Sequence, residues 1–401
     1  MTARKPRSAE APPPKTQIPL FDLRKQHEGL EAQMLAAVRE VFESATFVMG
    51  PNVRAFEAAM AEFHGVRHAV GVASGTDALM LSLAALGIGR GHEVLVPSFT
   101  YTATAAAVCH VGATPVFVDS LPDGFNLDPD DLARRITDRT RAIIPVHLYG
   151  ESAPMDAVLA IARERGLRVV EDVAQACGAR WRGRRLGSLG DAGCFSFYPT
   201  KTLAGCGDGG MVITDDDAVA DRVRLLRQQA DASVAGGEKY THPMVGYNSR
   251  LDEVQAAVLR LKLPRLDAWN ARRVEHANLY RKRLAGSGIG LPAASVDGSH
   301  IYSLFTLRCP WRDELRARLA ERGIGSAIYY PVPLHLQGAY RDLGYENGSL
   351  PVAERLAREV VSIPLYPELT VEQVEAVADA VLESAAAAGR PGAEERVGHE
   401  L

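Results

Sequence analysis

Lys201 stands in a sequence context that can make its amine reactive. It follows GCFSFYPT, a segment typical of a strand and a proline turn, and small or apolar residues flank it. Burial in such a place disfavours the charged ammonium, lowers the pKa of the lysine and leaves an amine that attacks aldehydes. Most lysines are solvated surface charges instead, so a catalytic role for Lys201 requires suitable partners.

Three further groups have the chemistry of such partners. Asp172 ends the segment LRVVED, and a carboxylate at a strand end can keep a pyridine nitrogen protonated. The Ser74–Thr76 turn lies between a predicted strand and a predicted helix, where free backbone N–H groups favour a phosphate. Ser196 can bond the same phosphate, and Gln175 can reach an oxygen of the ring. These are the contacts that pyridoxal phosphate (PLP) needs, although Asp172 and Ser74–Thr76 are also ordinary helix-capping residues.

The glycines after Lys201 imitate a dinucleotide-binding motif. Gly205, Gly207 and Gly210 satisfy G-x-G-x-x-G, but the motif requires a strand before the glycines and a helix after them. Here the glycines follow the lysine loop and lead into the predicted strand MVIT. No G-x-x-x-x-G-K precedes the Lys-Thr pair either, so both nucleotide-binding interpretations are rejected.

Short β-branched segments alternate with helical patterns in the first 250 residues. This alternation predicts βαβ units and a mostly parallel sheet covered by helices on both faces. A long amphipathic helix with a bend at Pro264 follows at 251–284. Strands are expected at 68–74, 93–97, 115–119, 141–148, 167–172, 193–198 and 210–214, and helices at 77–88, from Thr102, from near Asp128 and at 154–166.

The chain of 401 residues is long enough for two lobes. We expect a flexible tail at 1–16, a large α/β domain at 17–265, a smaller α+β C-terminal domain at 266–386 and a second flexible tail at 387–401. The five cysteines have no paired spacing, so neither a disulfide framework nor a metal site is predicted. A net charge of −4 gives no reason to expect nucleic acid, and no apolar run approaches a membrane span. A soluble, cytoplasmic protein is the expectation.

Taken together, these motifs resemble the DegT/DnrJ/StrS family of nucleotide-sugar aminotransferases, which are fold-type-I PLP enzymes. The resemblance runs from about Ile18 to about Ala385, and its motifs occur in the family's order. They are GPNVRAFEAAMAEFHGV, VASGTDALMLSLAALGIG, VPSFTYTATAAAV, GATPVFVD, IIPVHLYG, EDVAQACGA, GCFSFYPTK, GDGG, GYNSRLDEVQAAVL and YPVPLHLQGAY. The fold implied is a seven-stranded-type, mostly parallel sheet between helices with a smaller C-terminal domain.

The resemblance implies roles for the residues around the cofactor ring. Lys201 would carry PLP as a Schiff base and act as the general base, while Asp172 would pair with the pyridinium nitrogen. Gln175 would contact the ring hydroxyl, and Tyr101 would stack on the ring unless it is a core residue at the sheet edge.

The resemblance also implies how the phosphate is held. Gly75, Thr76 and Ser196 would bind it from the same chain, and Asn248 would reach it from the neighbouring subunit. The active sites would then be shared between the two subunits of a homodimer.

Two departures from the family pattern fall near the expected substrate. Thr202 replaces the common asparagine after the lysine, and Tyr329-Tyr330-Pro331 replaces His-Tyr-Pro. Tyr329 is therefore a candidate substrate contact. His335 is another candidate, although a core or capping role is an equal alternative.

The segment NSRLDEVQAAVLRLKL is most similar to enzymes that aminate a 3-keto carbon of dTDP-linked deoxysugars. The expected activity is amino transfer from L-glutamate to such a sugar, by a ping-pong scheme, in amino-sugar and antibiotic biosynthesis. Amination at C4 of a nucleotide keto-sugar or of a keto-cyclitol such as a scyllo-inosose remains an alternative. A non-catalytic PLP-binding regulator is a remote one, since no extra effector domain is evident.

Overall fold

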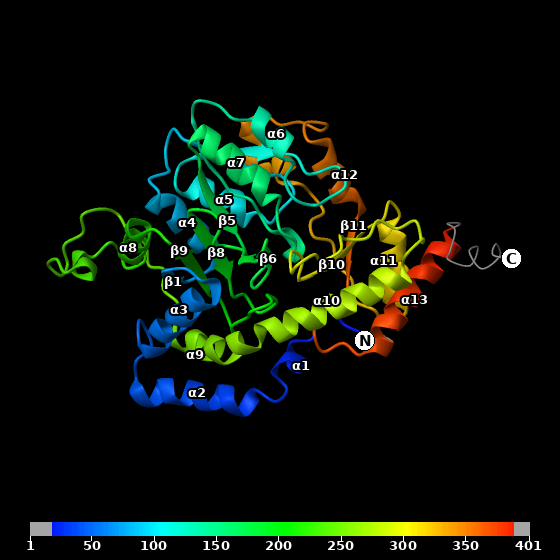
Figure 1. The fold of residues 1–401 in the computed structure, drawn as a ribbon, viewed down its shortest axis with the longest axis horizontal. Coiled ribbons are helices and arrows are strands. Elements are labelled where there is room, and N and C mark those ends of the chain that lie inside the picture. Colours follow the sequence, from blue (N-terminus) through cyan, green and yellow to red (C-terminus); the bar gives the residue numbers. More distant parts are fainter. Residues whose placement is uncertain (1–17, 389–401) are drawn as a thin grey trace, which may run out of the picture.

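The computed structural model describes residues 18–388 (Figure 1). The N-terminal tail predicted at 1–16, and all but the first two residues of the C-terminal tail predicted at 387–401, lie outside the described residues. Within the described part, a seven-stranded sheet between helices is joined to a smaller group of helices around a two-stranded sheet. This architecture confirms the predicted fold class.

The central sheet has the strand order β1-β9-β8-β5-β4-β2-β3. The pairs β1–β9 and β8–β9 are antiparallel and the other four pairs are parallel, so β9 alone is reversed. The strands are β1 (His68–Val72), β2 (Glu93–Pro97), β3 (Thr114–Val118), β4 (Thr140–Ile143), β5 (Arg168–Asp172), β8 (Ala192–Ser196) and β9 (Gly210–Thr214).

Both faces of the sheet are buried. Successive side chains of a strand point to opposite faces and therefore pack in different hydrophobic clusters. In β2, Val94 and Val96 pack in one hydrophobic cluster, whereas Leu95 packs in another on the opposite face. The first face is covered by α4 (Gly75–Ala85), α5 (Ala103–His110) and α8 (Asp217–Leu226). The second face is covered by α3 (Pro51–His64), α6 (Pro129–Arg134), α7 (Met155–Arg165) and α9 (Glu253–Lys262).

The long helix expected at 251–284 is interrupted where the proline stands. α9 ends at Lys262, Pro264 lies in the short 3₁₀ segment η3 (Leu263–Arg265), and α10 (Leu266–Arg283) continues from there. A proline donates no backbone hydrogen bond and its ring crowds the preceding turn, so the regular α-helix stops at this point. α10 then runs towards the smaller group of helices (Figure 1).

A second hydrophobic core lies in the C-terminal part of the chain. The antiparallel pair β10 (Phe305–Arg308) and β11 (Val360–Ile363) packs there with α10, α11 (Arg312–Glu321) and α13 (Val371–Ala387). Ile18 also packs in this core, while Leu356 of α12 (Pro351–Glu359) packs in the core under the large sheet. Core contacts therefore cross the expected boundary near residue 265, and the domain limits stay a prediction.

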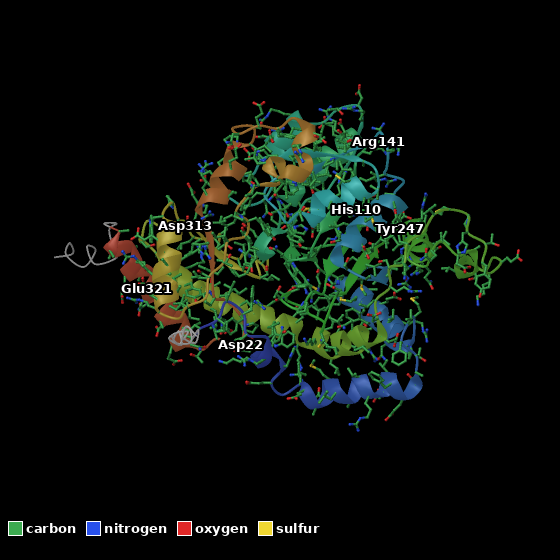
Figure 2. All side chains as sticks on the ribbon, turned by 180° about the vertical axis from the view of Figure 1, so that it is seen from behind. Asp22, His110, Arg141, Tyr247, Asp313 and Glu321 are labelled. Carbon is green, nitrogen blue, oxygen red and sulfur yellow. The ribbon has the colours of Figure 1, made fainter. Side chains whose placement is uncertain are left out.

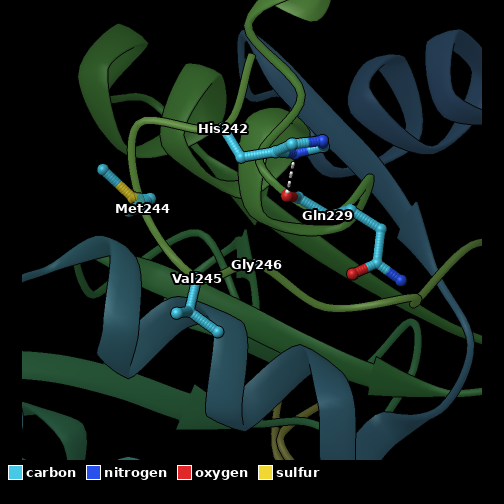
Figure 3. Close-up of a pocket in the computed structure, with 5 residues that line it drawn as sticks. All are labelled: Gln229, His242, Met244, Val245 and Gly246. Atoms are coloured by element: carbon cyan, nitrogen blue, oxygen red, sulfur yellow. Dashed lines mark hydrogen bonds between the residues drawn. The ribbon is translucent and has the colours of Figure 1, made fainter. Parts of the chain in front are cut away.

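A segment at 228–247, between α8 and α9, projects from the rest of the chain (Figure 1). Tyr247 lies at its base when the molecule is viewed from behind (Figure 2). Inside the segment, His242 Nδ1 lies 2.9 Å from the Gln229 carbonyl oxygen, a contact drawn in Figure 3. This hydrogen bond joins the two arms of the projection.

The remaining elements are short or lie at the periphery. The sequence patterns missed the hairpin of β6 and β7, because two-residue strands carry no periodicity. No helix in residues 18–388 is both long and apolar enough to cross a lipid bilayer. The short or peripheral elements are α1 (Leu23–His27), α2 (Glu31–Ser44), β6 (Arg180–Trp181), β7 (Arg184–Arg185), η1 (Leu148–Gly150), η2 (Ala232–Ala235), η4 (Leu334–Leu336) and η5 (Gly338–Leu343).

Candidate active site

Most of the residues singled out in the sequence gather at one edge of the central sheet. Strands β1, β2, β5 and β8 run in one direction, so their carboxyl ends share that edge. Ser74 follows β1, Tyr101 follows β2, Asp172 ends β5 and Lys201 follows β8. Ligands of parallel α/β sheets bind at this edge, where loops leave room between helix ends.

Lys201 and Asp172 are both buried and lie close enough for their opposite charges to interact. Burial lowers the pKa of the Lys201 amine, and attraction to Asp172 opposes that shift only in part. Burial raises the pKa of Asp172, against hydrogen bonds from Ala174 and Thr104 and the attraction of Lys201. These directions agree with a desolvated lysine near a strand-end carboxylate, and the catalytic roles of the two residues stay predictions.

The Asp172 carboxylate is held by two donors. Thr104 Oγ1, on α5, donates to Asp172 Oδ2 at 2.9 Å, and the Ala174 backbone N–H donates to Oδ1 at 3.1 Å. These bonds fix the orientation of the carboxylate at the strand end. Thr104 was not identified from the sequence, although it lies in the motif TYTATAAA beside Tyr101.

A second buried pair stands directly behind Asp172. His147 Nε2 lies 3.0 Å from Glu171 Oε2, and both side chains are fully buried. Glu171 also accepts backbone N–H bonds from Gly187, Leu189 and Gly190. Burial raises the pKa of Glu171, but the bonds from His147 and the backbone outweigh it and lower that pKa overall. Sequence reasoning missed this pair, which anchors the end of β5.

The N-terminus of α4 packs tightly on the strand that leads to Lys201. Ser74 caps the helix by accepting from the Asp77 N–H at 3.1 Å. A Cβ atom placed on Gly75 would lie only 2.7 Å from Ser196 Cβ, so only glycine fits there. The predicted phosphate residues Gly75, Thr76 and Ser196 are thereby brought together at a helix N-terminus, where backbone N–H groups favour an anion.

Gln175 bonds to two tyrosines, and a third tyrosine lies beside one of them. Gln175 Oε1 accepts from the Tyr149 N–H at 2.7 Å, and its Nε2 donates to the Tyr330 hydroxyl at 3.2 Å. The ring of Tyr101 lies 5.9 Å from that of Tyr330 and is 56% exposed, so Tyr101 is not a core residue. Its expected ring stacking stays a prediction.

One cavity connects the reactive lysine with these groups. Tyr329 lines it, and so does Thr202, the departure next to the lysine, while a contact of Tyr329 with substrate stays a prediction. Its lining residues are Phe21, Gln175, Thr200, Lys201, Thr202, Ser303, Leu304, Tyr329 and Tyr330.

His335 lies elsewhere, and the structure favours the core alternative for it. Its side chain is fully buried, Nδ1 lies 2.6 Å from Ser98 Oγ, and Nε2 lies 3.2 Å from Glu354 Oε1. Both ring nitrogens are engaged and His335 is not among the described residues that line the cavity, so the geometry favours the core alternative, and a substrate contact stays an untested prediction.

Asn248 is exposed and lines a different surface hollow from Lys201. It shares that hollow with Ala73, Asp208 and Arg250. The next residue, Ser249, donates to Asp77 Oδ2 of α4 at 2.7 Å. Asn248 is thus displayed on the surface beside α4 rather than placed inside the cavity of its own chain.

The residues at this edge fit PLP. An aldehyde needs a desolvated amine, a pyridinium nitrogen needs a buried carboxylate, and a phosphate needs a helix N-terminus without a blocking Cβ. Lys201, Asp172 and the close Gly75–Ser196 approach meet these three needs. Fold and site together define a PLP-dependent enzyme of fold type I.

The family of this enzyme follows from comparison with known proteins. The sequence matches the DegT/DnrJ/EryC1/StrS aminotransferase family over residues 29–382. It is 49% identical to the dTDP-3-amino-3,4,6-trideoxy-alpha-D-glucose transaminase of Streptomyces venezuelae, covering 91% of this chain and 96% of the relative. It is 44% identical to a pleiotropic regulatory protein of Geobacillus stearothermophilus, covering 91% and 98%.

Solved structures agree with this assignment. DesV of Streptomyces venezuelae, crystallised in complex with a ketimine intermediate, matches with a TM-score of 0.88, 49% identity and coverage of 92% and 98%. NtdA of Bacillus subtilis with bound cofactor PMP matches with a TM-score of 0.85, 29% identity and coverage of 92% and 86%. The chain belongs to the DegT/DnrJ/EryC1/StrS aminotransferase family, and it is a PLP-dependent sugar aminotransferase.

Proposed function

We propose that the protein transfers the amino group of L-glutamate to the C3 keto carbon of a dTDP-linked keto-deoxysugar in amino-sugar biosynthesis. The observation that carries the proposal is the placement of Lys201 opposite Asp172 in a chain 49% identical to a dTDP-3-amino-sugar transaminase. The cytoplasmic location expected from the sequence stays a prediction.

The proposed mechanism assigns each side chain one task. PLP, when bound, supplies an electron-withdrawing ring that stabilises negative charge on the carbon bearing the amino group. Asp172 holds a proton on the ring nitrogen, and Thr104 holds the Asp172 carboxylate in place. Gly75, Thr76 and Ser196 bind the phosphate from the end of α4.

Lys201 is the proton carrier of this scheme. Its lowered pKa leaves more of the amine neutral than in an exposed lysine, and a neutral amine accepts a proton. Lys201 Nζ takes the proton from the α-carbon of the amino donor in the first half-reaction. In the second half-reaction, it delivers a proton to complete the amino sugar.

The active unit is proposed to be a homodimer in which Asn248 serves the neighbouring site. Support comes from the exposure of Asn248 and from the projecting segment just before it. There, Val245 is 91% and Tyr240 is 77% exposed, and Val245 borders the surface hollow of Figure 3.

The test compares three acceptors with L-glutamate as donor: a dTDP-3-keto-6-deoxyhexose, a dTDP-4-keto-6-deoxyhexose and scyllo-inosose. Sustained release of 2-oxoglutarate, beyond the single turnover of the donor half-reaction, only with the 3-keto sugar supports the proposal. Turnover of the 4-keto sugar or of the inosose alone would replace it with the corresponding alternative. No turnover with any acceptor, together with no donor half-reaction, would point to a non-catalytic PLP-binding protein.

A further inference from the structure

Ser303 lines the active-site cavity with a hydroxyl that has no hydrogen-bond partner in the described chain. Its Oγ atom is buried and unpartnered, and the residue faces the same cavity as Lys201, Gln175 and Tyr330. A buried hydroxyl without a protein partner is costly, and one that lines a cavity is placed where a bound ligand can satisfy it.

The backbone of Ser303 is fixed against the loop after β4. Ile301 donates to the Gly150 carbonyl at 2.9 Å, and Leu304 donates to the Tyr149 carbonyl at 3.4 Å. Gly150 has φ +91°, and a Cβ on it would lie 2.9 Å from the Ser303 nitrogen. The serine is therefore held in place by its neighbours, and only rotation about Cα–Cβ is needed to redirect its hydroxyl.

The chemistry of the cavity distinguishes between the two substrates of the proposed reaction. Among its described lining residues, Lys201 is the single cation, and five residues carry hydroxyl groups, whereas a neighbouring hollow that shares Lys201 is also lined by Arg273. A dicarboxylic amino donor calls for arginine or lysine partners, whereas a neutral ring with several hydroxyls calls for neutral donors and acceptors. The five are Thr200, Thr202, Ser303, Tyr329 and Tyr330.

We infer that Ser303 hydrogen-bonds a ring hydroxyl of the acceptor sugar and so helps to select hydroxylated keto-sugars over deoxygenated ones. The inference rests on the proposed function, because it concerns the sugar half-reaction. A site built to bond a substrate hydroxyl disfavours an analogue that lacks it, because the protein group is then left unpaired.

The test measures binding without turnover. Protein in the pyridoxamine phosphate form cannot react with an amino sugar, so calorimetry yields a dissociation constant directly. Two ligands are used: dTDP-3-amino-3,4,6-trideoxy-α-D-glucose and its 4-hydroxylated counterpart. Ser303→Ala is expected to weaken binding about three- to tenfold, the range for one lost neutral hydrogen bond. If Ser303→Ala weakens binding of the 4-hydroxylated ligand alone, the contact is with the C4 hydroxyl. If it weakens binding of both ligands, the contact is with the C2 hydroxyl, which both carry.

Ser120→Ala is the matched control. Ser120 Oγ is also buried and unpartnered, but Ser120 does not line the cavity. Both variants are expected to keep the thermal unfolding midpoint of the wild type, since neither loses a hydrogen bond. Only Ser303→Ala is expected to change sugar binding, and its half-reaction with L-glutamate is expected to stay at the wild-type rate.

Unchanged sugar binding in Ser303→Ala would overturn the inference. Equal losses in the glutamate half-reaction and in sugar binding would overturn it too, because they would show a general effect on the site. Failure of the proposed function is separable, since the wild-type protein would then bind neither amino sugar.

Discussion

At the scale of single residues, the site depends on two buried charges of opposite sign. A lysine and a carboxylate are both disfavoured by burial, as the lowered pKa of Lys201 and the raised pKa of Asp172 record. Groups with perturbed pKa values cluster at functional sites. Burial of the two charged groups lowers the free energy of unfolding, because each loses its hydration, but it makes the lysine amine more reactive.

Asp172→Asn tests the carboxylate with an almost isosteric side chain. The rate of the L-glutamate half-reaction is expected to fall about 10²- to 10³-fold, as when one preorganised electrostatic contact is removed. The folded-state pKa of Asp172 is raised, so its stabilising contribution is present at low pH and lost as pH rises through that pKa. The Asp172→Asn protein, whose amide stays neutral, is therefore expected to unfold at or above the wild-type temperature at about pH 7.5. A half-reaction at the wild-type rate would refute the role of Asp172.

At the scale of elements, the proposed phosphate site depends on the start of α4 lying against β8 without a side chain between them. Gly75 approaches Ser196, and a Cβ on Gly210 would lie 2.2 Å from the Ser74 carbonyl oxygen. Two glycines on different elements thus permit one close approach. With that approach, the free backbone N–H groups at the start of α4 and the Ser196 hydroxyl can bond one phosphate.

Gly75→Ala is expected to weaken PLP binding at least about tenfold, since the new methyl group displaces Ser196 from the end of α4. The dissociation constant, measured by cofactor fluorescence during dialysis, checks this result. Gly338→Ala is the control, because nothing lies within 4 Å of a Cβ at Gly338. Equal affinities in the two variants would contradict the proposed phosphate site.

The packing of α3 on β8 predicts a dependence of stability on acid. His64 is buried at the end of α3, with Nδ1 3.0 Å from the Met60 carbonyl oxygen and its ring 4.7 Å from that of Phe195. Burial lowers the pKa of His64 to about 4, although the bond to Met60 opposes the shift. The contribution of this neutral histidine is complete above its unfolded pKa of 6.5 and is lost as pH falls towards 4.

Loss of this contribution lowers the free energy of unfolding by about 2 kcal/mol as the pH falls from 7 to 5. His64→Leu is expected to reduce the fall of the thermal midpoint over that range, measured by circular dichroism. His110→Gln is the control, because His110 is exposed at the end of α5 (Figure 2). The prediction fails if His64→Leu and the wild type lose stability in parallel.

At the scale of the whole molecule, the proposed site is incomplete in one chain. Lys201 lines the cavity of its own subunit, whereas Asn248 lies on an exposed surface beyond α4. In a symmetric dimer, each chain would then supply the other cofactor residues of its own site and Asn248 for the site of its partner.

Mixed dimers test this arrangement. Lys201→Ala and Asn248→Asp are each expected to be inactive alone, the second because it sets a carboxylate against the phosphate. After unfolding and refolding together, about a quarter of wild-type activity is expected, since half of the dimers are mixed and contain one intact site. Absence of any recovery, with mixed dimers shown by mass spectrometry, would place Asn248 in the site of its own chain.

The amino-acid sequence by itself determined the alternation of elements, the bend at Pro264, and the candidates Lys201, Asp172, Gly75 and Ser196. Each of these depends on local pattern: strand and helix periods, a missing amide proton, or a residue type at a strand end. Family resemblance, also carried by local motifs, then named the cofactor and the reaction class.

Only the tertiary structure decided which side chains meet. Thr104 holds Asp172 across 68 positions, and His335 is engaged by Ser98 across 237, so neither contact leaves a local signal. The same is true of the unpartnered hydroxyl of Ser303, whose surroundings come from distant loops. The physical reason is that parallel strands bring their carboxyl ends to one edge only when the crossover helices have packed, and no short window of sequence records that packing.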